Sequence, residues 1–222
     1  MNLNKHIDFF DPSNLDCAIH IIGCGAIGSR IAEILVRLGC TKIHLWDFDT
    51  VSPHNITNQL FRSIDIGKPK VNCLVEMLTQ INPMVELIQH GKYEKQNISG
   101  YVFLCVDSID LRREIATHLK TNPYVKAMFD ARMRLTDAQS YGADWSDKES
   151  KEAFLNSMQF SSDEAKEATP VSACGTTLSV LPTVATIASL TVSNFINFTL
   201  GKEIQSIILL DAFSYDLNAF KM

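Results

Sequence analysis

The hydrophobic and polar positions of residues 18–51 fall into three successive patterns. An apolar run, AIHIIG, is typical of a buried parallel strand. A later run, KIHLWDFD, predicts a second strand that carries Asp47 and Asp49 at its carboxyl end. Between the two runs, up to Gly39, apolar residues recur at helical spacing: Ile27, Ile31, Ile34, Leu35 and Leu38. Together these patterns predict a strand–helix–strand unit with an acidic residue after its second strand.

The turn between the first strand and the helix carries Gly23, Gly25 and Gly28 in GxGxxG spacing. Glycines let the backbone approach a phosphate closely, and a helix N-terminus offers it unpaired N–H groups and a partial positive charge. Asp47 lies where a carboxylate accepts hydrogen bonds from ribose hydroxyls. The unit therefore predicts a nucleotide-binding site, without specifying the nucleotide.

The rest of the chain continues to alternate between helical and strand-like patterns. The predicted helices span residues 69–81, 108–119 and 151–158, and a long apolar stretch within 178–200 that starts near Pro182. The predicted strands span residues 85–89, 101–107, 125–130, 131–144 and 204–213. This alternation predicts an α/β fold, a Rossmann-like, doubly wound, mostly parallel sheet with an additional C-terminal strand and helix portion.

A chain of 222 residues suits a single domain spanning 1–222. Residues 1–16 are expected to form an N-terminal arm that packs on this domain. The polar stretch 146–169 is expected to be a mobile crossover loop after a short helix. The helix within 178–200 is apolar nearly all round, so it is expected to be buried in the core or against a second subunit.

Ligands of doubly wound sheets bind beyond the carboxyl ends of the strands. The glycine turn, Asp47, Asp107 and Arg132 all fall at such ends, so we expect them to converge on one crevice. The connection after the second strand is rich in side chains that can bind a nucleotide: His54, Asn55, Asn58, Gln59, Arg62, Lys68 and Lys70.

Composition and charge exclude several classes of protein. The net charge is -5 and no run of Lys and Arg forms a basic face, which argues against non-specific binding of nucleic acid. The N-terminus lacks the apolar core of a signal peptide, and no apolar run is expected to cross a bilayer, so the prediction is a cytoplasmic protein. Six cysteines are scattered without a CxxC pair, so no zinc site is predicted.

The order of motifs resembles the ThiF/MoeB/HesA family, the bacterial relatives of ubiquitin-activating enzymes. The chain shows GxGxxG, then DFDTV, HNxxNQ and DIGKPK, then Asp107 at a strand end with Arg112 five residues later. The resemblance runs from about residue 21 to residue 201. It implies adenylation of the C-terminal carboxylate of a small ubiquitin-like or sulfur-carrier protein, with ATP and Mg²⁺, by an enzyme that is commonly a homodimer.

The resemblance also implies a role for each matching residue. Gly23, Gly25 and Gly28 match the turn around the ATP phosphates, and Asp47 matches the ribose-binding acid. The remaining matches are the polar pair Asn55 and Gln59, the phosphate-binding Lys70, and Asp107, which holds Mg²⁺ and supports attack on the α-phosphate. A carboxylate that attacks a phosphoryl group brings two anions together, so this chemistry needs a lysine, a metal and amide donors.

Three positions depart from the family pattern. The arginine usually found before the glutamine is replaced by Asn58, and no arginine precedes Arg30 in the N-terminal region. The usual CxxC pairs are also missing. Arg62 is a candidate substitute for one of the two arginines. Cys174 precedes the long apolar helix, where relatives place a cysteine that forms a persulfide or thioester, and the alternative is a structural thiol.

For the other candidate site residues, an ordinary structural role is the alternative to a functional one. Lys70 is either a phosphate ligand or a surface lysine, and Asp107 either works in the site or caps the following helix. Arg132 is either a site residue or the partner of a buried carboxylate. At the level of function, the alternatives to adenylation are a non-catalytic nucleotide-binding or scaffold protein, an NAD-dependent oxidoreductase, and a tRNA-modifying dehydratase, for which a basic RNA-facing patch is expected.

Overall fold

A computed structural model describes residues 1–173, 175 and 177–221. Within them the strands form one eight-stranded sheet with the order β3-β2-β1-β4-β5-β6-β7-β8. The parallel strands are β1 (Ile19–Ile22), β2 (Lys42–Trp46), β3 (Glu86–His90), β4 (Gly100–Leu104) and β5 (Val125–Arg134). The strands added antiparallel beyond β5 are β6 (Asp137–Asp144), β7 (Ile207–Asp211) and β8 (Asp216–Phe220). The predicted Rossmann-like, mostly parallel α/β fold is confirmed.

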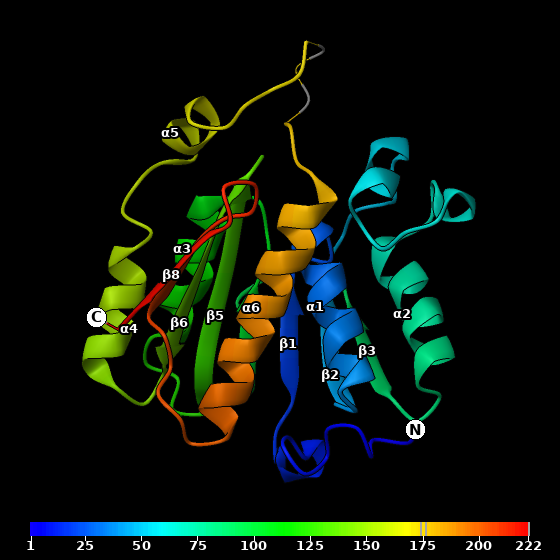
Figure 1. The fold of residues 1–222 in the computed structure, drawn as a ribbon, viewed down its shortest axis with the longest axis vertical. Coiled ribbons are helices and arrows are strands. Elements are labelled where there is room, and N and C mark those ends of the chain that lie inside the picture. The colour runs from blue at the N-terminus through cyan, green and yellow to red at the C-terminus, as the bar shows by residue number, and fades with distance from the viewer. Residues whose placement is uncertain (174, 176, 222) are drawn as a thin grey trace.

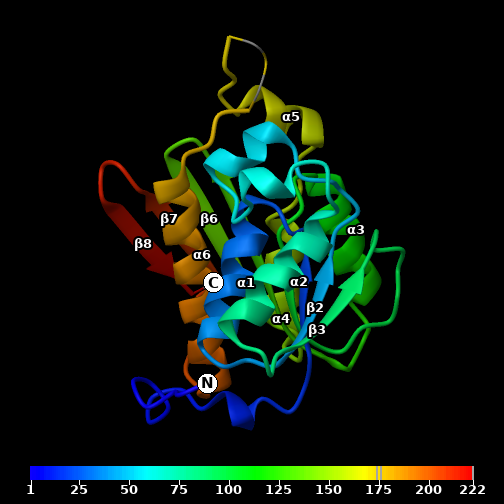
Figure 2. The ribbon, with the colours of Figure 1, turned by 90° about the vertical axis from the view of Figure 1, so that its right-hand side faces the viewer.

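Helices cover both faces of the sheet, as Figures 1 and 2 show. One face carries α1 (Ala26–Arg37), α2 (Lys70–Ile81) and α6 (Leu181–Thr199) over a core that includes Ile21, Ile43 and Phe103. The other face carries α3 (Ile109–Leu119) and α4 (Lys148–Asn156) over a core that includes Val102 and Trp145. Residues that alternate along the strands supply these two cores, because successive side chains of a strand point to opposite faces.

The start of each helix follows local chemistry. Gly25 is the N-cap of α1, and Pro69 precedes the first residue of α2. The Ser108 hydroxyl accepts a hydrogen bond from the Leu111 N–H and caps α3, and the Asp147 carboxylate caps α4 through the Ser150 N–H. Asp107 is therefore not the cap of α3, and that alternative reading of this residue is wrong.

Two sequence predictions for the second half need correction. The strand predicted at 125–130 continues to Arg134, and the return strand β6 begins only at Asp137, because the two-residue connection between them is tighter than the pattern suggested. β8 was not predicted: its polar and apolar residues alternate only over Asp216–Ala219, and all five of its residues are exposed, so it presents no buried face. It pairs only with β7, at the edge of the sheet.

The range 146–169, predicted as a crossover loop, holds α4 and the short helix α5 (Ser162–Glu167). The Ser162 hydroxyl donates to the Asp110 carboxylate at 2.6 Å, which links α5 to α3. The predicted mobility of this range stays a prediction. At the opposite end of the sheet, the N-terminal arm packs with Phe10 buried, and a 3₁₀ turn, η1 (Pro12–Asn14), leads into β1.

The apolar helix α6 packs against α1, β5 and β6. It is 19 residues long with a mean hydropathy of 1.2, so by length and composition alone it is long and apolar enough to cross a membrane, contrary to the expectation from the sequence. In the fold it is a core helix, with Val184, Ile187, Val192 and Phe195 fully buried. Outward-facing hydroxyls such as those of Thr186 and Ser189 bond back to carbonyl groups one turn earlier.

Candidate nucleotide-binding site

The glycine turn between β1 and α1 lies at the carboxyl edge of the parallel strands (Figure 1). Gly23 has a φ of +96°, and a Cβ there would lie 2.6 Å from the Cys105 carbonyl carbon. A Cβ on Gly28 would lie 1.9 Å from the Gly23 carbonyl oxygen. Gly25 differs, because a Cβ there would meet no atom within 4 Å. The fold itself requires Gly23 and Gly28, whereas Gly25 faces open space at the N-terminus of α1.

Asp47 joins the end of β2 to this turn. Its Oδ2 accepts a hydrogen bond from the Cys24 N–H at 2.7 Å, and its Oδ1 accepts one from the Asp49 N–H at 2.8 Å. The residue is half-buried, and a carboxylate retains further acceptor sites after two such bonds. The structure therefore places Asp47 beside the glycine turn with capacity to accept from a bound ligand.

Lys70 lies at the start of α2 and is only 7% exposed, so it is not an ordinary surface lysine. Its Nζ pairs with Asp49 Oδ2 at 2.9 Å, and the Asp49 side chain is 53% exposed. Lys70 is also close enough to Cys24 to oppose the rise that burial causes in the pKa of that thiol. The lysine therefore lies near the glycine turn, with its charge held by an exposed carboxylate that a ligand can replace.

Of the polar pair after β2, Asn55 lies in the 3₁₀ turn η2 (Pro53–Thr57), and Gln59 lies in the connection between η2 and a second 3₁₀ turn, η3 (Ser63–Asp65). Asn55 is buried and accepts from the Ser52 N–H at 2.8 Å, so its Oδ1 shapes the turn. The Gln59 Oε1 is buried without a hydrogen-bond partner within the described part of the chain. Asn58, at the family's arginine position, donates to the Ser179 hydroxyl in the segment before α6.

Asp107 is exposed in the turn between β4 and α3. This turn lies against the glycine turn, because the Cys105 N–H donates to the Ile22 carbonyl at 2.7 Å and the Cys105 backbone borders Gly23. Its carboxylate makes no side-chain hydrogen bond with the residues that the structure describes. Asp107 thus lies at the same edge as Gly23, Asp47 and Lys70. The crevice predicted from the sequence held the glycine turn, Asp47 and Asp107, and also Arg132.

The other arginines considered from the sequence are already paired. Arg62 bonds Asp65 at 3.0 Å and Glu76 at 2.9 Å, and both partners raise its pKa through hydrogen bonds. Arg30 pairs with Glu33 at 3.1 Å on α1. Both guanidinium groups are thus engaged in ion pairs, while the Arg30 Nε is buried without a hydrogen-bond partner among the described residues.

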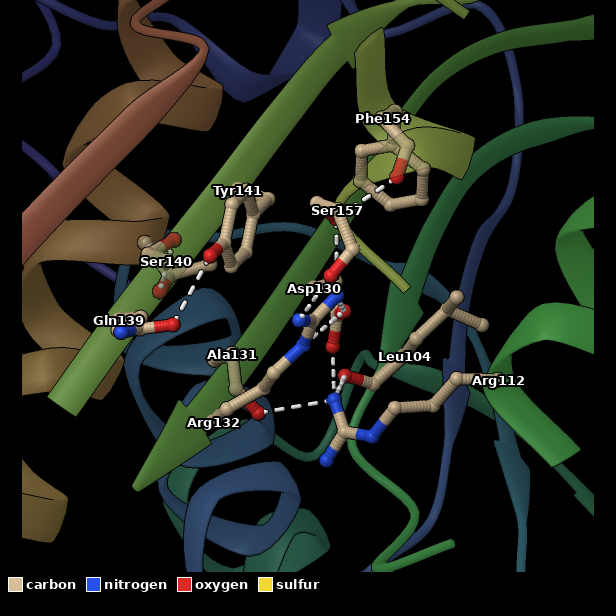
Figure 3. Close-up of polar contacts among 11 residues, drawn as sticks. Leu104, Arg112, Asp130, Ala131, Arg132, Gln139, Ser140, Tyr141, Phe154 and Ser157 are labelled. Atoms are coloured by element: carbon tan, nitrogen blue, oxygen red, sulfur yellow. Dashed lines mark hydrogen bonds and ion pairs between the residues drawn. The ribbon is translucent and has the colours of Figure 1, made fainter. Parts of the chain in front are cut away.

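Arg132 does not join the crevice. Figure 3 shows it beside Asp130, where its Nε donates to Asp130 Oδ2 at 2.7 Å. It also donates to the carbonyl and hydroxyl of Ser157 at 2.8 and 3.0 Å, and its guanidinium lies 4.3 Å from the centre of the Tyr141 ring. Of the two readings that the sequence left open, the partner of a buried carboxylate is correct.

The cysteines that the structure describes are free thiols. Burial raises the pKa of Cys17 to about 11 and the pKa of Cys40 and Cys105 to about 12. Cys24, within the glycine turn, is fully buried, and burial raises its pKa well above the usual range. At neutral pH these four thiols are therefore protonated, and their role is to pack against their neighbours. Cys174 lies outside the described residues, so its role stays a prediction.

The side chains at this edge suit the implied Mg²⁺ only together with bound phosphates. Over 1–173, 175 and 177–221, no group of three or more His, Cys, Asp or Glu is arranged to hold a metal ion. Mg²⁺ in nucleotide sites is commonly held by one or two carboxylates together with substrate phosphates. A single exposed carboxylate without a side-chain partner, Asp107, fits that mode of binding.

The family model described as "ThiF family" matches residues 14–222. The chain belongs to the ThiF family. The resemblance inferred from the motifs is therefore confirmed, and with it the assignment of the chain to a family with a nucleotide-binding Rossmann-like fold.

Two curated relatives with different activities in their names are similar to part of this chain. It is 41% identical over 117 residues to ubiquitin-like modifier-activating enzyme 5 of Dictyostelium discoideum, covering 44% of this chain and 31% of the relative. It is 30% identical over 116 residues to tRNA threonylcarbamoyladenosine dehydratase 1 of Saccharomyces cerevisiae, covering 47% of this chain and 27% of the relative. The chain spans less than a third of either relative.

Two solved structures show the same fold. Escherichia coli MccB, crystallised with ATP, aligns with a TM-score of 0.75 at 17% identity, over 95% of this chain and 65% of that one. PaaA aligns with a TM-score of 0.71 at 16% identity, over 99% of this chain and 69% of that one. At these identities the likeness concerns the fold.

Two features of this edge were not predicted from the sequence. Asp49 was noted at the strand end without a role, although its place two residues after Asp47 and its pairing with Lys70 make it part of the site. The buried contact between Arg112 and Asp130 was also missed. The sequence signal for this contact was the position of Arg112, five residues after Asp107.

Proposed function

We propose that this protein adenylates the C-terminal carboxylate of a small ubiquitin-like or sulfur-carrier protein, using ATP and Mg²⁺. The observation that carries the proposal is the arrangement of the carboxyl edge in a ThiF-family chain. The glycine turn, Asp47, Lys70 and Asp107 come from four separate segments and lie at one edge of the sheet.

The reaction assigns a task to each group. A carboxylate oxygen of the carrier attacks the α-phosphorus of ATP, the bond from that phosphorus to the bridging oxygen breaks, and pyrophosphate leaves. Open space at Gly25 and the N–H groups of α1 suit the phosphates, and Lys70, released from Asp49, would balance their charge. Mg²⁺, when bound, neutralises phosphate charge, and Asp107 is the residue that would hold it.

Calorimetric titration with ATP·Mg²⁺ and, separately, with NAD⁺ tests the proposal. We expect ATP·Mg²⁺ to bind the wild type, NAD⁺ to be silent, and Lys70→Met to weaken ATP binding. The matched control is Lys68→Met, since Lys68 is 52% exposed and lies two residues away. Binding of NAD⁺ with ATP silent would favour an oxidoreductase, and binding of neither nucleotide would favour a non-catalytic scaffold; each result contradicts adenylation.

A tRNA target is the second candidate, because the yeast relative is named a tRNA threonylcarbamoyladenosine dehydratase. The net charge of -5 and the absence of a basic run favour a protein carrier. Titration with total tRNA at low and high salt separates the two. Salt-sensitive tRNA binding by the wild type would favour the RNA target, and its absence the carrier protein.

The homodimer and the cytoplasmic location remain proposals. The apolar side of α6, which the sequence offered as a dimer surface, is occupied by the protein's own core. A homodimer would therefore use the outward side of α6 or another surface. Light scattering on the purified chain measures the oligomeric state directly.

A further inference from the structure

Arg112 and Asp130 are buried, Arg132 is half-buried beside them, and the three side chains form one cluster with unbalanced charge (Figure 3). Asp130 is fully buried and contacts both guanidinium groups. Burial lowers the pKa of Arg112 to about 9 and of Arg132 to about 10, so both arginines remain charged at neutral pH. Two cations and one anion leave an excess of positive charge in this cluster, which attracts an anion at the neighbouring strand end.

The anion outside this cluster that acts on Arg112 is Asp107. Burial and repulsion from Arg132 lower the pKa of Arg112, and attraction to Cys105 and to the Asp107 carboxylate opposes that shift. Burial raises the pKa of Cys105 to about 12, so its thiol is protonated at neutral pH and Asp107 is the anion that remains. Asp107 is exposed at the nucleotide edge, while Arg112 is 6% exposed beneath it. The excess positive charge of the cluster is therefore within electrostatic reach of the carboxylate that the proposed function assigns to Mg²⁺.

Arg112 also fixes the strand end from which the turn bearing Asp107 departs. Its Nη1 donates to the Leu104 carbonyl, the last residue of β4, at 3.1 Å. The same nitrogen donates to the Ala131 carbonyl of the neighbouring strand β5 at 3.0 Å and to Asp130. One guanidinium group thus ties β4 to β5 three residues before Asp107.

We infer that Arg112 is a positioning residue for Asp107, and that Asp130 holds Arg112 in place for this task. The inference rests on the proposed function, because it assigns Arg112 to the edge that binds ATP and Mg²⁺. Arg132 serves a different purpose: it joins β5 to the end of α4 through Ser157. Loss of a residue that orients a metal ligand typically costs about 10- to 100-fold in metal affinity.

The test compares Arg112→Lys and Asp130→Asn with the control Arg132→Lys, because Arg132 contacts the same carboxylate but bonds Ser157 in place of the β4 strand end. ATP is titrated calorimetrically into each variant with and without Mg²⁺, and circular dichroism verifies folding. We expect Arg112→Lys and Asp130→Asn to reduce the gain in ATP affinity that Mg²⁺ provides by about tenfold or more. Affinity for Mg²⁺-free ATP should be unchanged, and Arg132→Lys should keep the full gain.

Several results would overturn the inference. These are a wild-type response to Mg²⁺ in Arg112→Lys, an equal loss in Arg132→Lys, ATP binding by the wild type that ignores Mg²⁺, or failure of both test variants to fold. Failure of the proposed function is distinguishable, because it shows in the wild type as no binding of ATP under either condition. That result would contradict both the proposed function and the inference about Arg112.

Discussion

Asp107 follows β4 and Asp130 lies within the neighbouring strand β5, and the two carboxylates differ in exposure and pairing. Asp107 follows β4, is exposed, and makes no side-chain hydrogen bond within the described residues. Asp130 lies within β5, is fully buried, and is held between two guanidinium groups. A carboxylate at the open edge is hydrated and stays available to a ligand, whereas a buried one must be paired inside the protein. Their difference in exposure therefore assigns Asp107 to ligand binding and Asp130 to the structure that supports the site.

The largest expected effect comes from removing the buried member of this pair. Asp130→Ala leaves Arg112 and Arg132 without their shared anion, so we expect the free energy of unfolding to fall by about 3–5 kcal/mol. Asp107→Ala, the matched control, should change it by about 0.5 kcal/mol or less. Urea-induced unfolding followed by tryptophan fluorescence measures both. Equal losses would mean that Asp107 is also structural.

Gly28 and Gly25 of the glycine turn give a second comparison between a position that the fold requires and one that faces open space. Gly28→Ala places a Cβ 1.9 Å from the Gly23 carbonyl oxygen, so we expect a loss of about 3 kcal/mol in the free energy of unfolding. Gly25→Ala should cost about 1 kcal/mol or less, because its Cβ meets open space. If a phosphate occupies that space, Gly25→Ala weakens ATP binding with little change in stability. Unchanged ATP binding would place the phosphates elsewhere.

The buried His20 makes the stability of the fold depend on pH. Burial, followed by repulsion from His44, lowers the pKa of His20 to about 3, and its Nδ1 accepts from the Trp46 indole N–H at 3.2 Å. The unfolded chain takes up this proton near pH 6.5, but the folded chain does not until about pH 3. Stability should therefore fall as the pH drops below 6.5, by about 2 kcal/mol at pH 5 from His20 alone.

His20→Gln retains an acceptor for Trp46 and cannot take up the proton, so it should remove that part of the acid sensitivity. His54→Gln, at an exposed position, is the control. Unfolding by urea at pH 7.5 and pH 5 measures the difference. The same loss between these two pH values in the wild type and in His20→Gln would contradict the assignment.

The sequence predicted those parts of the fold and site that are local in the chain. Glycine spacing, helical periodicity and strand-end acids lie within short windows, and the turn at Gly23 and the parallel sheet follow from them. The contact between Arg112 and Asp130 was not predictable in this way, because it joins α3 to β5 and exists only once β4 and β5 pair. β8 was missed because an exposed edge strand needs no apolar alternation.

The role of Asp107 is tested most directly by titrating ATP, with and without Mg²⁺, into Asp107→Asn and the wild type, and by thermal unfolding of both proteins. Asp107→Asn should unfold at the wild-type temperature and lose the part of the ATP affinity that Mg²⁺ provides. A variant that unfolds at a lower temperature yet binds ATP and Mg²⁺ as the wild type does would contradict the account, because Asp107 would then support the fold and not the ligand.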